Sequence, residues 1–139
     1  MNVPAQPAAW PLRVLIVDDH GGCRGLIREV LEGCTSINDV GVPTFVECAS
    51  GEAALASLAT TTPDLVTMDL RLGGMDGIEC LRRMRLRVPE AVIVVVTCAK
   101  SPELARRSLL EGADSILCKD DLSTLPQLIA GYWSTGTCG

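Results

Sequence analysis

The sequence predicts an α/β fold in which helices cover both faces of a doubly wound, five-stranded parallel sheet. Five apolar runs rich in β-branched residues alternate with stretches of helical patterning, an order that is typical of this class. The run at 91–96 is almost entirely apolar, which indicates a strand buried on both faces. The five expected strands are 12–17, 44–48, 64–68, 91–96 and 115–118.

The stretches between these runs have the periodicity of amphipathic helices, about five in number. Apolar residues share one face of the first helix and recur at helical spacing in the third. They are Leu26, Ile27, Val30 and Leu31 in the first, and Ile78, Leu81 and Met84 or Arg85 in the third. A loop is expected between Glu32 and Pro43. The last helix is expected to begin near Pro126, with Ser123 or Thr124 as its cap.

Composition limits the class of protein. The 139 residues are enough for one domain with a single core. A hydrophobic content of 47% against 21% charged residues indicates a globular chain rather than a disordered one. The net charge of −5 argues against broad nucleic-acid binding, which requires clustered basic residues in excess. One local run of arginines is expected to be the solvated face of a helix, with a partner-docking surface as the alternative: Arg82, Arg83, Arg85 and Arg87.

Nothing in the sequence indicates export or membrane insertion. Residues 1–11 contain three prolines and no Lys or Arg, unlike a secretory signal, and no apolar run approaches the roughly 20 residues of a membrane span. The seven cysteines lack paired spacing, so reduced and mostly buried thiols are expected. We therefore expect a soluble cytoplasmic protein with an extension at 1–11, one domain at 12–131 and a tail at 132–139.

Polar side chains stand at the carboxyl ends of four expected strands. Asp18 and Asp19 follow the first strand, and Asp69 follows the third. Thr97 follows the fourth strand and Lys119 follows the fifth. In an open parallel sheet these ends meet at one edge, where ligand sites form. Each feature alone is ordinary for a turn, a cap or a solvated surface, so their convergence is what indicates a site.

This set of side chains suits metal-assisted phosphoryl chemistry. Three neighbouring carboxylates repel one another, and either a raised pKa or a divalent cation relieves the repulsion. Mg²⁺ prefers oxygen ligands in octahedral geometry, so carboxylates and a backbone carbonyl would hold it. The cation would bridge a carboxylate and an incoming phosphoryl group, while Thr97 and Lys119 bind other phosphoryl oxygens. The set is therefore competent for phosphorylation on a carboxylate.

Several stretches of the chain resemble response-regulator receiver domains. They are VLIVDDH at 14–20, DLVTMD at 64–69 with MDG at 75–77, VVVT at 94–97, and GAD at 112–114 with Lys119. The likeness covers about residues 12–131. It implies the flavodoxin-like, CheY-like fold with strand order 2-1-3-4-5, in agreement with the alternation of strands and helices. It also implies a place in a bacterial two-component phosphorelay.

The resemblance implies a role for each residue of the site. Asp69 would accept the phosphoryl group from a sensor histidine kinase or a phosphotransfer protein. Asp19 would bind Mg²⁺ directly and Asp18 mostly through water. The backbone carbonyl of Arg71 would complete the metal site. Such a chain catalyses only its own phosphorylation and dephosphorylation, and is otherwise not an enzyme.

The same resemblance implies how the signal leaves the site. Thr97 would move toward the phosphoryl group while Lys119 pairs with it. The face formed by the fourth helix, the fifth strand and the fifth helix would respond by a population shift between two conformations. The recipient would be a downstream protein or an effector domain outside this chain. The receiver itself would be a monomer or a phosphorylation-linked dimer.

Five positions depart from the usual receiver pattern or qualify it. Gly73 stands where proline is usual, which predicts a more flexible loop. Ile116 stands where an aromatic residue usually rotates inward, so the usual coupling is in question. Asp120 replaces another proline, as in a subgroup whose full-length members bind DNA. His20 is expected to be a loop or capping residue rather than an acid–base group. Cys98 is expected to be a small packing residue rather than a redox thiol.

Two other hypotheses fit the same residues. A receiver-like scaffold would signal through protein contacts without phosphorylation, and Gly73 and Ile116 favour it. A phosphoester hydrolase with an aspartyl-phosphate intermediate is disfavoured, because the sequence offers neither a second acid–base carboxylate beside Asp69 nor a substrate-capping insertion. No segment has the pattern of a helix-turn-helix, so direct DNA binding is not expected.

Overall fold

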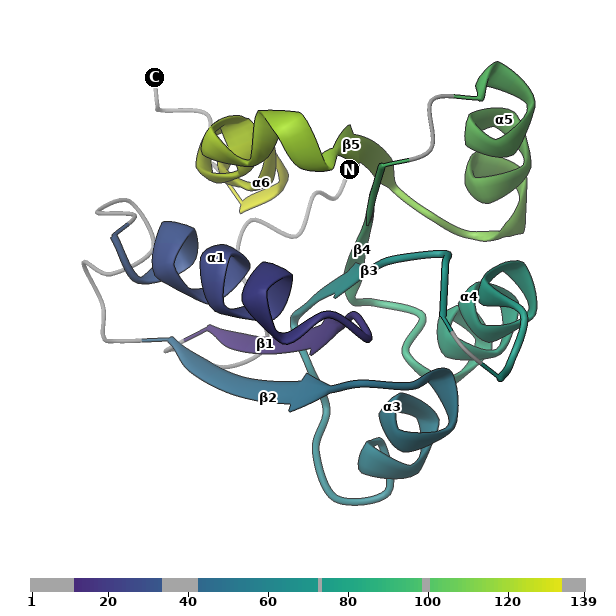
Figure 1. Ribbon diagram of the computed structural model, residues 1–139. Coiled ribbons are helices and arrows are strands. Elements are labelled where there is room, and N and C mark those ends of the chain that lie inside the picture. The colour runs from purple at the N-terminus through teal and green to yellow at the C-terminus, as the bar shows by residue number, and fades with distance from the viewer. Residues whose placement is uncertain (1–11, 34–42, 73, 99–100, 134–139) are drawn as a thin grey trace.

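The computed structural model describes residues 12–33, 43–72, 74–98 and 101–133 and has three layers, with a parallel sheet between two layers of helices (Figure 1). The sheet has five strands in the order β2-β1-β3-β4-β5, which confirms the predicted order. Each strand lies within one residue of its predicted bounds. The strands are β1 (Arg13–Val17), β2 (Thr44–Cys48), β3 (Leu65–Met68), β4 (Val92–Thr97) and β5 (Ser115–Cys118).

The helices fall on two sides of the sheet. In Figure 1, α1 and α6 cover one face, and α3, α4 and α5 cover the other. A short 3-10 helix, η1, leads from β5 into α6. The bounds are α1 (Gly21–Glu32), α3 (Gly51–Ser57), α4 (Gly77–Arg87), α5 (Pro102–Glu111), η1 (Lys119–Thr124) and α6 (Leu125–Trp133).

Strand β4 shows how the sequence divides the core. Successive side chains of a strand point to opposite faces of the sheet. Val92, Val94 and Val96 pack in the cluster that contains residues of α1 and α6. Ile93 and Val95 pack in the cluster that contains residues of α4. All six residues of β4 are buried, so the interpretation of 91–96 as a strand covered on both faces is confirmed.

The predicted helical faces are confirmed except at one position. In α4, the predicted residues Ile78, Leu81 and Met84 are all buried. In α1, Ile27 and Leu31 are buried, but Leu26 is 50% exposed. A helix turns by about 100° per residue, so Leu26 lies on the edge of the buried face and the prediction for it was wrong.

The end of the chain differs from the expected tail. Helix α6 continues from η1 without the predicted cap, because the Thr124 hydroxyl donates a hydrogen bond to the Asp121 carbonyl instead. The helix ends at Trp133, two residues beyond the predicted end at Gly131. The Tyr132 hydroxyl donates to the Asp114 carbonyl at 3.1 Å. The start of the expected tail is therefore an ordered helical turn held against the loop before β5.

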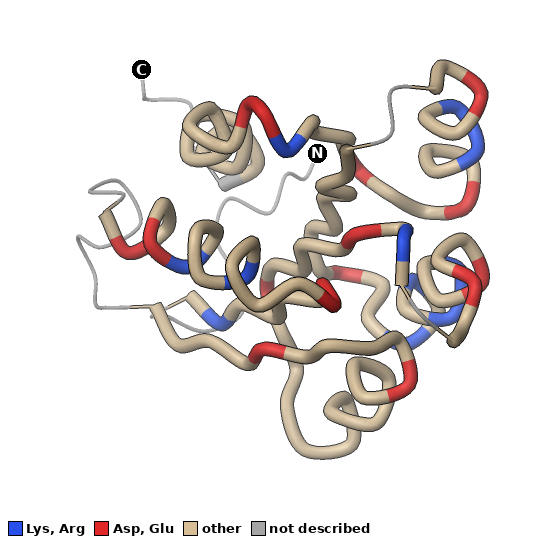
Figure 2. Tube along the Cα trace, in the orientation of Figure 1, with Lys and Arg blue, Asp and Glu red and all other residues tan. Residues whose placement is uncertain are grey.

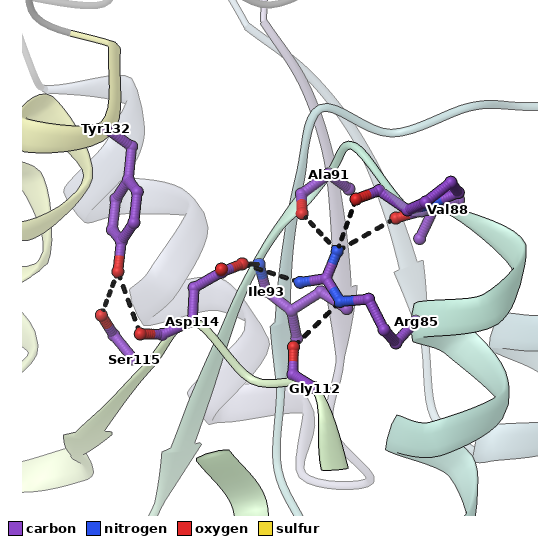
Figure 3. Close-up of polar contacts among 9 residues, drawn as sticks. Arg85, Val88, Ala91, Ile93, Gly112, Asp114, Ser115 and Tyr132 are labelled. Carbon is purple, nitrogen blue, oxygen red and sulfur yellow. Dashed lines mark hydrogen bonds and ion pairs between the residues drawn. The ribbon is translucent and has the colours of Figure 1, made fainter. Parts of the chain in front are cut away.

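The run of arginines in α4 is not uniformly a solvated face. Arg85 turns inward, and its guanidinium reaches Asp114 and the Gly112 carbonyl (Figure 3). Arg82 and Arg83 lie on the outer side, where both form ion pairs with Glu79. The prediction of a solvated face is therefore wrong for Arg85 and confirmed for Arg82, Arg83 and Arg87, which are exposed.

The expectation of mostly buried thiols is only partly confirmed. Of the described cysteines, Cys48 and Cys80 are buried, while Cys98 is exposed; all five described thiols are free. Cys34 and Cys138 lie outside the described residues, as does most of the loop expected after α1. None of the described helices is long and apolar enough to cross a membrane.

Candidate functional site

Two buried carboxylates lie side by side at the carboxyl ends of neighbouring strands. Val17 and Met68 are paired in the sheet, and Asp18 and Asp69 are the residues that follow them. The Asp69 amide donates to the Val17 carbonyl at 2.9 Å, and the Asp18 amide donates to the Cys48 carbonyl at 3.0 Å. Asp18 is 1% and Asp69 5% exposed. The backbone ladder therefore fixes both residues at one point of the rim.

Lys119 connects these two carboxylates. Its Nζ lies 2.7 Å from Asp69 Oδ2 and 2.8 Å from Asp18 Oδ2. Asp69 Oδ2 accepts an aligned hydrogen bond, whereas Asp18 Oδ2 is an ion-pair partner without one. Burial alone would lower the pKa of Lys119, but its polar contacts with Asp18 and Asp69 and the charges of the two carboxylates outweigh burial and raise the pKa above its ordinary value. The ammonium therefore stays charged at neutral pH and offsets one of the two negative charges.

The second oxygen of each carboxylate is held by the backbone of its own turn. Asp18 Oδ1 accepts from the His20 amide, and Asp69 Oδ1 accepts from the Arg71 amide, both at 2.9 Å. Each aspartate thus bonds the amide two residues further on, which is the pattern of an Asx turn. The turns orient both side chains so that their Oδ2 atoms face the same ammonium.

The other predicted residues stand at the same rim in different surroundings. Thr97 ends β4 and is 2% exposed. Asp19 is exposed, unlike Asp18. In the part of the chain that the structure describes, no three carboxylate, His or Cys side chains are arranged to hold a metal ion. The structure thus brings together Asp18, Asp69 and Lys119, and the ammonium occupies the space between carboxylates where the sequence suggested a cation.

The structure shows the surroundings of three positions at which the sequence departs from, or qualifies, the usual receiver pattern. His20 is the N-cap of α1, and its Nδ1 accepts a hydrogen bond from the Cys23 amide at 3.2 Å. The prediction of a capping residue is confirmed. Cys98 is exposed, so its interpretation as a packing residue was wrong. Asp120 lies in η1 directly after Lys119 and is exposed.

Ile116 lines an open cavity next to the site. The cavity has a volume of about 260 Å³ and is bounded by Thr97, by the first turn of α5 and by β5. Ile116 is half-buried and packs against the core cluster below α4. A residue smaller than the usual aromatic ring therefore leaves space beside Thr97. Gly73, another of the departures, lies outside the described residues.

Arg24 contacts the site, and the sequence did not predict this contact. Its Nη1 donates to the Asp18 carbonyl at 2.6 Å, and its Nε lies 3.2 Å from Glu47 Oε1. The side chain therefore holds the loop after β1 against β2. The sequence separation of six residues between Asp18 and Arg24 is not typical of any motif, because the contact depends on the direction in which α1 follows β1.

Comparison of the sequence with known proteins identifies a family. The family described as the response regulator receiver domain matches residues 14–130. A protein-glutamate methylesterase/protein-glutamine glutaminase of Burkholderia thailandensis is 38% identical over 122 residues, which are 87% of this chain and 33% of that protein. Sporulation initiation phosphotransferase F of Bacillus subtilis is 36% identical over 101 residues, 73% of this chain and 76% of that protein. The chain spans 33%, 31% and 30% of three methylesterase relatives.

Solved structures lead to the same family. A two-component response regulator of the LuxR family from Aurantimonas superposes with a TM-score of 0.75 at 31% identity, covering 86% of this chain and 83% of that one. A CheY-like receiver domain from Methanospirillum hungatei gives a TM-score of 0.74 at 26% identity, covering 86% and 91%. With its five-stranded order 2-1-3-4-5 and the matched residues 14–130, the chain belongs to the response regulator receiver domains of two-component systems.

Proposed function

We propose that this chain is a phosphoryl-accepting switch in which Asp69 is the phosphorylated residue. The observation that carries the proposal is the pairing of the buried Asp69 carboxylate with Lys119 at the carboxyl end of β3. A carboxylate held in this way is oriented for attack, and the ammonium can follow the charge onto a new phosphoryl group. An Asp69 oxygen would form a bond to phosphorus as the donor's phosphorus–nitrogen bond breaks and the donor histidine takes up a proton.

We further propose that the switch requires Mg²⁺. Asp18, Asp19 and Asp69, with the backbone carbonyl of Arg71, would hold it. Two buried carboxylates share one ammonium, so one negative charge is not offset, and Asp18 Oδ2 lacks an aligned hydrogen bond. Carboxylate and carbonyl oxygens are the ligands that a hard divalent cation prefers, so Asp18 and Asp69 could hold it with water completing the coordination. When bound, the cation supplies charge neutralisation for the phosphoryl oxygens.

The roles of the remaining residues follow from their places at the rim. Lys119 would pair with one phosphoryl oxygen and so give up part of its contact with Asp18. The Thr97 hydroxyl would donate a hydrogen bond to another phosphoryl oxygen. These two residues end β4 and begin η1, so their movement would alter the face formed by α5, β5 and α6. That face would pass the signal on.

The donor and the recipient are proposed by class. A sensor histidine kinase or a phosphotransfer protein would phosphorylate Asp69, in the cytoplasm. The recipient would be a downstream protein or an effector domain, and the receiver would act as a monomer or a phosphorylation-linked dimer. The chain itself would catalyse only its own phosphorylation and dephosphorylation. Residues 12–133, which include the last turn of α6, would form the receiver, with flanking segments at 1–11 and 134–139.

Intact mass measured after incubation with acetyl phosphate tests this function. The wild-type chain is expected to gain one phosphoryl mass with Mg²⁺ and none with excess chelator. Asp69→Asn should gain none, while Asp121→Asn, a control at an exposed position of η1, should behave as the wild type. If the wild type is not modified and beryllofluoride changes no amide resonance, the chain is a scaffold that signals without phosphorylation.

A further inference from the structure

The outer faces of α4 and α5 carry the same pattern of four side chains. A glutamate is followed at the third and fourth positions by two arginines and at the seventh by a leucine. The residues are Glu79, Arg82, Arg83 and Leu86 on α4, and Glu103, Arg106, Arg107 and Leu110 on α5. This spacing puts all four on one stripe of a helix. Leu86 and Leu110, at equivalent positions, are each 78% exposed.

The two helices that carry these stripes are neighbours. Helices α4 and α5 are in contact and cover the same face of the sheet (Figure 1). Arg85 Nε donates to the carbonyl of Gly112, the C-cap of α5, at 2.9 Å. This contact joins the carboxyl-terminal ends of the two helices. Leu86 and Leu110 are close to it in sequence, so both exposed leucines stand at the same end of the helix pair.

The surface is basic in an acidic protein. Without Arg85, which turns inward, helices α4 and α5 contain five of the twelve Lys and Arg residues but only three of the seventeen Asp and Glu residues, a net charge of +2 in a chain of net charge −5. Figure 2 shows basic residues on both helices. Among the described residues, Arg87, Arg106 and Arg107 form no ion pair, whereas Glu79 is already paired with Arg82 and Arg83. Positive charge is therefore available to a partner.

We propose that this arginine–leucine face of α4 and α5 binds a segment of a partner protein in which acidic and apolar side chains alternate at helical spacing. Carboxylates would pair with the arginines, which offer two parallel donors each, and apolar side chains would cover Leu86 and Leu110. Single exposed leucines are ordinary, but two at matched positions among arginines form an amphipathic surface. The face contains none of the residues of the Asp69 site, so a partner can bind it in the unphosphorylated chain; it shares α5 with the face proposed to pass the signal on.

A nucleic acid fits these observations less well. Phosphates would contact the arginines but would leave Leu86 and Leu110 uncovered in the complex. The net charge of −5 would also oppose a polyanion as large as a DNA duplex. A short acidic segment contacts only the basic face and avoids most of that repulsion, which falls off over a Debye length of about 8–10 Å.

The test uses a synthetic amphipathic peptide of about 18 residues, with Glu and Leu on one helical face, and a scrambled peptide of equal composition. Amide resonances of the full chain are followed during titration. Shifts are expected to be confined to α4 and α5. The double variant Leu86→Ser/Leu110→Ser and the double variant Arg83→Glu/Arg106→Glu should each weaken the Kd at least about tenfold. Leu26→Ser is the matched control, because Leu26 is 50% exposed on α1, across the sheet, and its Kd should stay within about twofold.

Four results would overturn the proposal. The first is that the designed peptide does not bind, or that it shifts the resonances of other elements. The second is that the scrambled peptide binds equally well. The third is that Leu26→Ser weakens binding as much as the double variants do. The fourth is a different occupant: a DNA duplex binds through the arginines while the peptide does not, or the chain self-associates in a way that Leu86→Ser/Leu110→Ser abolishes. Urea unfolding shows whether each variant is folded. Phosphorylation of each variant shows whether the function proposed for Asp69 is intact, so that a failure of this inference can be told apart from a failure of that function.

Discussion

Arg85 Nη2 lies 2.7 Å from Asp114 Oδ2, and the same carboxylate oxygen accepts the Ile93 amide at 2.9 Å (Figure 3). The pair therefore joins α4, the start of β4 and the loop before β5. The other guanidinium nitrogens donate to the Gly112 carbonyl and to the carbonyls of the turn after α4, including that of Ala91 at 2.9 Å. One side chain thus satisfies several carbonyls that lie far apart in the sequence.

Arg85→Lys is expected to reduce the free energy of unfolding by about 2 kcal/mol, although it preserves the charge. A lysine has a single ammonium, which cannot reach Asp114 and the carbonyls of Gly112 and Ala91 together. The free energy of unfolding falls because some of these carbonyl oxygens are left without a hydrogen-bond donor. Arg82→Lys on the outer face should change stability by less than about 0.5 kcal/mol. Urea unfolding of both variants makes the comparison, and equal losses would mean that Arg85 acts only as a surface charge.

Much of the fold was predictable because buried strands impose a local signal. The apolar run at 91–96 and the aspartates after β1 and β3 can be recognised without knowledge of the partners. Once a parallel sheet is assumed, topology alone brings Asp18, Asp69 and Lys119 to one edge. These parts of the site follow from which strand each residue ends, and the structure agrees with them.

The contacts that were missed depend on three-dimensional packing. Arg85 resembles its neighbours Arg82 and Arg83 in the sequence, and only the position of Gly112 against α4 turns it inward. Leu26 fits the apolar pattern of α1 but lies beyond the area that the sheet covers. Rules based on residue type cannot separate such cases, because they depend on the angle and position at which each helix packs.

Lys119→Met is expected to lower the free energy of unfolding by about 3 kcal/mol at pH 7. The raised pKa of Lys119 keeps its ammonium charged, so its contribution is fully present below the ordinary lysine pKa and is lost only as the pH rises through the raised value. Without it, Asp18 and Asp69 are two buried carboxylates with no counter-charge between them. Chemical unfolding measures the loss.

Two further measurements test whether the missing charge causes the loss of stability in Lys119→Met. Millimolar Mg²⁺ should raise the Tm of Lys119→Met more than that of the wild type, because the cation replaces the ammonium. The double variant Lys119→Met/Asp18→Asn should be less destabilised than Lys119→Met, since one carboxylate charge is removed. If neither change restores stability, the lysine acts through packing of its side chain.

Gly77→Ala is expected to destabilise the chain by at least about 3 kcal/mol and to slow phosphorylation. A Cβ at Gly77 would lie 2.5 Å from the Leu70 Cα, so the backbone next to Asp69 must move. Gly25→Ala in α1 is the matched control, because no atom lies within 4 Å of its Cβ position apart from its chain neighbours and the backbone of its own helix. It should stabilise the chain by about 0.5–1 kcal/mol through helix propensity. Urea unfolding and acetyl-phosphate labelling measure both effects, and similar behaviour of the two variants would refute the close contact.

The buried Cys80 thiol is expected to make the chain less stable in alkaline solution. Burial, with a smaller effect of the Glu52 charge, raises its pKa from 9.0 to about 11. Between these two values the unfolded chain has lost the thiol proton and the folded chain has kept it. Stability is therefore fully present below pH 9 and falls between pH 9 and 11, by on the order of 2 kcal/mol. Urea unfolding of the wild type and of Cys80→Ala from pH 8 to 11 measures the slope. The variant should lose less stability over this interval than the wild type, and parallel curves would show that other groups cause the decline.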